Sequence, residues 1–148
     1  MRLEEVMPRI RENLAKGKNV QLAPMGDSML PMLKGGRDSI LLSPLPPHLR
    51  KYDVALYQRA DGSYVLHRIV GEKNGSYICC GDNQRKAESG IPHSKMIAVM
   101  TAFIRNGKFH SADEWGYRLY SRFIHDFRRL QGLFRRLRSK TSTPPSRP

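Results

Sequence analysis

Long apolar runs and separated cysteine pairs are both missing from this sequence of 148 residues. No stretch of about 18 consecutive apolar residues occurs, so we expect no segment to cross a bilayer as a helix. The first residues also lack an uninterrupted apolar stretch, and we expect no secretory signal there. Cys79 and Cys80 are adjacent, a spacing that disfavours a disulfide, and no second pair follows to complete a metal site. These absences predict a protein of a reducing, cytoplasmic compartment.

Acidic residues are scarce. The chain has 13 Asp and Glu against 26 Lys and Arg, which gives a net charge of +13. A chain with this balance prefers anionic partners such as nucleic acid, acidic lipid headgroups or acidic peptides. The apolar share of 39% and the charged share of 26% are those of a globular protein, so disorder over most of the length is not expected.

Short strand-like runs separated by turn dipeptides fill the middle of the chain. Asp61-Gly62 joins two such runs, and Asn74-Gly75 and Asn106-Gly107 mark further turns. We expect strands close to residues 19–23, 39–42, 53–58, 64–70, 77–80 and 96–105. The pattern predicts a mainly β fold, either a compact β-barrel or a folded sheet.

Amphipathic helices are expected on both sides of this β-rich part. Apolar residues at helical spacing predict a helix within residues 1–18, beginning or bending at Pro8. Apolar residues recur every three or four positions in residues 115–138, which predicts a longer helix. The predicted organisation is an N-terminal helix in 1–18, a β-rich domain in 19–112, a basic helix in 113–140 and a disordered Ser/Thr/Pro-rich tail in 141–148.

The C-terminal helix is strongly basic. Between residues 115 and 140, eight basic residues and one acidic residue, Asp126, give a net charge of +7. One interpretation is a helix that packs on the β-rich domain by its apolar side and leaves its arginines in solvent. The other is a helix whose residues 115–138 lie in an anionic membrane surface, with Trp115, Tyr117 and Tyr120 at the boundary.

A serine on a glycine-led turn and a distant histidine are the candidate catalytic pair. Ser28 lies in residues 26–31 (GDSMLP), and His67 lies in residues 65–68 (VLHR). A serine attacks a carbonyl only when a positioned base removes its proton, and imidazole titrates near neutrality. From the turn alone, a helix N-cap or turn serine is the favoured interpretation of Ser28, and a lone histidine such as His67 is usually a satisfied core residue.

Four short motifs occur in an order that resembles the type I signal peptidase family. They are GDSMLP at residues 26–31, YDVA at 52–55, HRIV at 67–70 and GDN at 81–83. The match covers roughly residues 21–105 and is similar to the serine–histidine branch of archaea and the endoplasmic reticulum. The self-cleaving domains of SOS repressors are more distant relatives. The resemblance implies a β-rich fold of this type, serine endopeptidase activity, and no metal or organic cofactor.

The resemblance also assigns roles to residues. It implies that Ser28 is the nucleophile and His67 the general base. The acid that orients His67 is either Glu88, near the place of the family's third residue, or Asp82 of the GDN motif. Each acid also has a structural interpretation. Asp82 could cap backbone N–H groups of a turn, and Glu88 could form an ordinary surface ion pair.

This sequence departs from the family pattern beside the nucleophile. Gly26 stands where a hydroxyl residue often helps to bind the oxyanion, so backbone N–H groups near Ser28 would have to do more. Asp27 places a negative charge next to the nucleophile, which disfavours an oxyanion if it points inward. The membrane-spanning anchor usual in signal peptidases is not found in this sequence.

The predicted function is cleavage of a leader or signal peptide from a peptide or protein substrate by acyl transfer. The alternative is a non-enzymatic cationic binding module, for nucleic acid or another acidic partner, built on a peptidase-like fold. The strand segments lack a dense basic and aromatic surface and no helix-turn-helix precedes them, so no specific nucleic acid is expected. The predicted location is the cytoplasm, with the basic helix as a route to peripheral membrane attachment.

Overall fold

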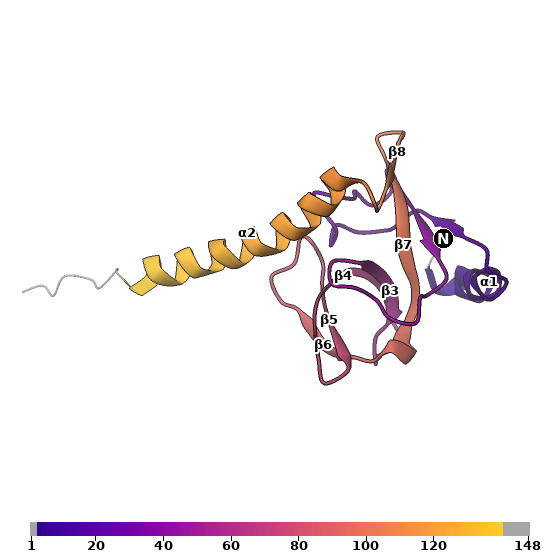
Figure 1. Ribbon diagram of the computed structural model, residues 1–148, viewed down its shortest axis with the longest axis horizontal. Coiled ribbons are helices and arrows are strands. Elements are labelled where there is room, and N and C mark those ends of the chain that lie inside the picture. Colours follow the sequence, from indigo (N-terminus) through magenta and orange to yellow (C-terminus); the bar gives the residue numbers. More distant parts are fainter. Residues whose placement is uncertain (1–2, 141–148) are drawn as a thin grey trace, which may run out of the picture.

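The computed structural model describes residues 3–140 of the chain, with side chains through residue 127 (Figure 1). The tail predicted for residues 141–148 lies outside the described residues. The elements, in chain order, are α1 (Leu3–Ala15), β1 (Val20–Leu22), β2 (Ser39–Ser43), β3 (Val54–Gln58), β4 (Tyr64–Lys73), β5 (Ser76–Cys80), β6 (Glu88–Ile91), the 3₁₀ turn η1 (His93–Lys95), β7 (Met96–Arg105), β8 (Lys108–Ser111) and α2 (Trp115–Lys140).

The strands form one antiparallel sheet, which confirms the prediction of a mainly β fold. Its order is β1-β2-β7-β3-β4-β5-β6, and β8 pairs with β7. The long strand β7 pairs with β3 through its first half and with β8 through its last residues, while β2 pairs along much of its other edge. Figure 1 shows the strands curving together, with α1 on one side and α2 leaving from the other.

The predicted Asn-Gly turns are present. Asn74 and Gly75 have φ values of 52° and 72°, and Asn106 and Gly107 have values of 50° and 73°. Two consecutive left-handed residues are what a tight two-residue hairpin needs, and Asn and Gly adopt that conformation at low cost. These turns join β4 to β5 and β7 to β8.

Strands β6 and β8 were not among the predicted strands. β6 has the sequence ESGI, which has little intrinsic strand preference, and it pairs with β5. β8 is the return strand of the Asn106-Gly107 hairpin. Both strands therefore depend on a partner strand rather than on local propensity.

The two helices lie where they were expected, with one difference. α1 begins at Leu3 and contains Pro8, so neither end of the helix falls at the proline. Met7, Ile10 and Leu14 are its buried residues. Among residues 3–140, no helix is both long and apolar enough to span a membrane.

The sheet buries residues on both faces. One core joins α1 and the segment after β1 to one face of the sheet, and the other core covers the opposite face and includes Tyr57 and Ile69. Successive residues of a strand point to opposite faces. In β4 this alternation directs His67 toward Tyr57, and Arg68 toward Met32 on the other side.

Candidate active site

Ser28 lies on the turn segment between β1 and β2. The next residue, Met29, and the nearby Met32 and Leu33 are buried and hold this segment against the core. The Leu33 N–H donates to the Met29 carbonyl at 2.9 Å. Ser28 itself is half-buried. Ser28 is therefore held at the edge of the core with part of its surface exposed.

Gly81 packs directly against the main chain of Ser28. A Cβ at Gly81 would lie 2.6 Å from the Ser28 carbonyl oxygen. A Cβ at Gly35 would overlap the main chain of Gly26 in the same way. The turn that carries Ser28 is therefore held on two sides by segments that approach as closely as only glycine allows.

The loop after β5 brings this turn to the strand that carries His67. Cys80 of β5 pairs with Arg68 of β4, so Gly81 follows at the level of His67. Two residues on, the Asn83 N–H donates to the Ser28 carbonyl at 2.8 Å. Ser28 and His67, 39 positions apart in the sequence, therefore both lie next to the loop that begins at Gly81. The Ser28 segment packs through Met32 on the face of Arg68, while the His67 side chain points to the face of Tyr57. Among the described residues no hydrogen bond joins their side chains, and such bonds often form only in the substrate complex.

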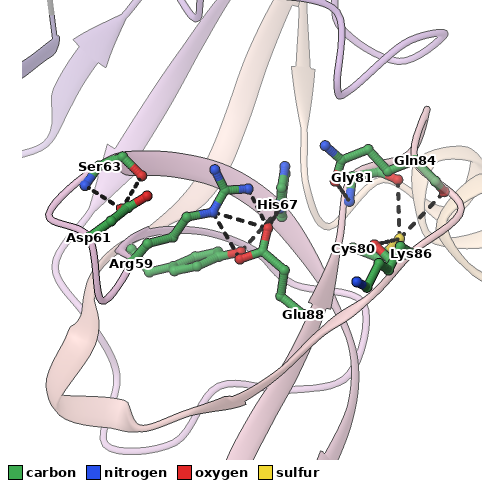
Figure 2. Close-up of polar contacts among 10 residues, drawn as sticks. Arg59, Asp61, Ser63, His67, Cys80, Gly81, Gln84, Lys86 and Glu88 are labelled. Atoms are coloured by element: carbon green, nitrogen blue, oxygen red, sulfur yellow. Dashed lines mark hydrogen bonds and ion pairs between the residues drawn. The ribbon is translucent and has the colours of Figure 1, made fainter.

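His67 is almost completely buried, with 1% of its surface exposed. Its Nδ1 lies 3.1 Å from the Tyr57 hydroxyl and 3.6 Å from Oε1 of Glu88. Arg59 Nε lies 3.0 and 3.1 Å from the two Glu88 oxygens, and Arg59 Nη2 also pairs with Oε1. Figure 2 shows Arg59 and His67 converging on the Glu88 carboxylate.

These partners assign the proton of the neutral imidazole to Nδ1. An ionised carboxylate can only accept hydrogen bonds, so an unprotonated Nδ1 facing Glu88 would be repelled. With the proton on Nδ1, the Tyr57 oxygen 3.1 Å away is positioned to accept it. Nε2 then carries the lone pair, which is the form a general base requires.

The charge states agree with this arrangement. Burial lowers the pKa of His67, and the nearby Glu88 carboxylate only partly opposes that effect. The hydrogen bonds from Arg59 lower the pKa of Glu88. Burial raises the pKa of Tyr57 well above its ordinary value. At neutral pH the cluster therefore holds a neutral imidazole, a protonated phenol and an ionised carboxylate.

Asp82 lies in a different cluster. Its two oxygens each accept a hydrogen bond of 2.7 Å from Arg68, and the Tyr120 hydroxyl donates to it at 3.1 Å. Arg68 and Asp82 are both buried. Of the two acids named from the sequence, the structure places Glu88 beside Nδ1 of His67. Asp82 belongs to the loop that contacts the Ser28 main chain and pairs with Arg68.

Arg68 connects this loop to α2. Its Nη1 donates to the Tyr52 carbonyl at 3.0 Å, to the Tyr117 hydroxyl at 3.2 Å and to the Ser121 hydroxyl at 2.8 Å. Sequence reasoning missed Arg68, Tyr57 and Arg59 as site residues. The spacing was a usable signal, because Tyr57 of β3 and Arg59, the first residue after β3, are two positions apart and both contact the cluster of Glu88 and His67.

Asp27 and the two cysteines were also considered from the sequence. Asp27 is exposed. Burial raises the pKa of the Cys79 thiol to about 12, so it is not a thiolate nucleophile at neutral pH. The Cys80 thiol faces the carbonyls of Gly81 and Gln84 at 3.5 Å and closes the loop (Figure 2). Within residues 3–140, no group of three or more His, Cys, Asp or Glu side chains is arranged to hold a metal ion.

Comparisons with protein-family models and with curated proteins gave no match to this chain.

Proposed function

We propose that this protein is a serine endopeptidase of the type I signal peptidase kind, with Ser28 as nucleophile and His67 as general base. The observation that carries the proposal is the setting of His67. The imidazole is buried and neutral, and its Nδ1 faces the Tyr57 hydroxyl and the Glu88 carboxylate. Its strand, β4, contacts the segment that carries Ser28 through Arg68 and Met32. The four ordered motifs support the same assignment.

The proposed reaction is acyl transfer. Ser28 Oγ attacks the carbonyl carbon of the scissile bond while Nε2 of His67 takes the hydroxyl proton. Collapse of the tetrahedral intermediate breaks the C–N bond, and the imidazolium returns the proton to the departing amine. Water then attacks the acyl-enzyme, again losing a proton to Nε2, and the Ser28 hydroxyl is restored. Glu88 offsets the positive charge that His67 gains in each transition state.

The Ser28 main chain can stabilise the oxyanion. In the described part of the chain, no hydrogen bond occupies the Ser28 N–H, and the Ser28 carbonyl is tied to Asn83. An N–H held in place next to the attacking oxygen is the usual oxyanion donor in acyl transfer. Asp27 is exposed, so its charge is screened by solvent rather than aimed at the developing oxyanion.

The proposed substrate is an extended leader or signal peptide. β1 is the terminal strand in the sheet order and runs directly into the segment that carries Ser28. A peptide added to the open edge of β1 would pair main chain to main chain and run toward the nucleophile. The resemblance implies small side chains just before the cleaved bond.

A peptide library assay tests this function. Purified protein is incubated with a diverse pool of synthetic peptides, and new termini are read by mass spectrometry. Wild-type protein should produce cleavages that Ser28→Ala and His67→Ala both lose. Cleavage that persists undiminished in either variant would remove the assigned role.

The competing function is a cationic binding module, which the net charge of +13 favours. Such a module would bind DNA or another polyanion with a steep dependence on salt while Ser28 stays chemically inert. Binding of this kind together with an empty cleavage assay would favour the module over the peptidase.

A further inference from the structure

Large apolar side chains are exposed along one side of α2. Trp115, Leu119, Phe123 and Phe127 follow one another at four-residue spacing and expose 80%, 57%, 63% and 44% of their surfaces. The Phe123 and Phe127 rings stack with centroids 5.4 Å apart, so the two turns present a continuous apolar surface. We call these four residues the α2 stripe. Exposed apolar patches of this size mark interaction surfaces.

A different side of α2 attaches the helix to the sheet. Tyr117 and Ser121 accept hydrogen bonds from Arg68, and the Tyr120 hydroxyl donates to Asp82. The helix therefore does not need the α2 stripe in order to dock. Beyond its first turns, α2 extends away from the strands as an arm (Figure 1). The stripe is left without a partner among the described residues.

Positive charge accompanies the α2 stripe. Arg118 and Arg122 are exposed one turn apart, next to Leu119 and Phe123. The sequence of residues 115–140 carries a net charge of +7. Apolar side chains beside exposed arginines suit a surface that offers acyl chains and anionic headgroups together.

Two other occupants fit less well. A second copy of the helix would bring two strongly basic segments together, and their like charges would oppose pairing. The phosphates of a nucleic acid would bind the arginines but would leave the α2 stripe exposed to water. We propose that α2 binds an anionic lipid bilayer, lying in its interface with the α2 stripe among the acyl chains and Arg118 and Arg122 at the headgroups.

The fluorescence of Trp115 can report this binding. Trp115 is the single tryptophan of the chain and belongs to the stripe. Phosphatidylserine-rich vesicles should shift its fluorescence to the blue and protect it from acrylamide, and pure phosphatidylcholine vesicles should do neither at physiological salt. Co-sedimentation with the same vesicles gives the partition coefficient.

Substitutions on α2 test the two parts of the surface separately. Leu119→Gln with Phe123→Gln should lower partitioning by about tenfold or more, because two apolar side chains no longer enter the bilayer. Arg118→Gln with Arg122→Gln should lower it by about fivefold for each arginine removed. Phe109→Gln is the matched control, since Phe109 is 63% exposed on β8 and lies outside the stripe.

Three results would overturn the proposal. They are unchanged partitioning of the Leu119→Gln/Phe123→Gln protein, equal binding of neutral vesicles, or a lipid-free dimer that those substitutions dissociate while wild-type protein ignores vesicles. Ser28→Ala should bind vesicles like wild type, so this test stands or fails independently of the peptidase proposal.

Discussion

The Tyr57 hydroxyl lies 3.1 Å from Nδ1 of His67, on the strand paired with the histidine's own strand. The Glu88 carboxylate, which can only accept, lies 3.6 Å from the same nitrogen, so the imidazole proton belongs on Nδ1 and Nε2 is left without one. A serine peptidase needs its histidine in this tautomer. In the proposed site, Tyr57 and Glu88 are the two groups placed to favour it.

Glu88→Gln should impair catalysis without unfolding the protein. The change removes the negative charge that stabilises the imidazolium in the transition state, and the amide can present N–H groups to Nδ1. We expect kcat/KM to fall on the order of 10²-fold. Glu72→Gln is the control, because Glu72 lies on β4 in a surface pair with His48, 3.4 Å away. Equal activity of the two variants would exclude Glu88 as the residue that positions His67.

The pH profile should reflect the burial of His67. Burial disfavours the imidazolium, so the histidine stays neutral at pH values where an ordinary one, with a pKa of about 6.5, is half protonated. The acidic limb of kcat/KM should therefore have its midpoint below about 6.5. Glu88→Gln should move that midpoint lower still, since it removes a carboxylate that favours protonation. A wild-type midpoint above neutrality would contradict this assignment.

Gly81→Ala should lower activity by displacing the nucleophile. The new methyl group would lie 2.6 Å from the Ser28 carbonyl oxygen, so one of the two main chains must move. A displacement of about 1 Å at a reacting group can reduce the rate on the order of 10²-fold. Gly71→Ala is the matched control, because its Cβ would meet only Ile78 Cδ1 at 3.6 Å. Wild-type kcat/KM in Gly81→Ala would show that this contact does not position Ser28.

Tyr120→Phe should loosen the attachment of α2. The phenolic hydroxyl bonds to the buried Asp82, and its loss should lower the free energy of unfolding by about 1 kcal/mol. Tyr64→Phe is the comparison, since Tyr64 packs against the core and its hydroxyl makes no hydrogen bond within the described residues. Denaturant unfolding of the two variants measures the difference. A Tyr120→Phe protein as stable as Tyr64→Phe would contradict the proposed energetic role of the bond.

Local signals were sufficient for much of the fold. Asn74-Gly75 and Asn106-Gly107 need left-handed backbone, and that requirement is visible in the residues themselves. β6 could not be found in the same way, because ESGI becomes a strand through pairing with β5 rather than through its own preference.

The choice between Asp82 and Glu88 also required three-dimensional information. His67 and Arg68 are neighbours in β4 and point to opposite faces, so each meets a different acid. Which acid lies on which face depends on the path of the chain after β5. Arg68 itself was unremarkable in the sequence, since its role comes from Asp82 and α2 meeting on one face of the sheet.

Covalent capture of Ser28 decides whether this alcohol is an activated nucleophile. A fluorophosphonate reagent is incubated with folded wild-type protein, and the modified residue and its rate of labelling are read by mass spectrometry. The proposed pair predicts one adduct, on Ser28, forming on the order of 10²-fold or more slowly in His67→Ala. Labelling of Ser28 at an equal rate in wild type and His67→Ala, or of other serines in preference to Ser28, would contradict the account.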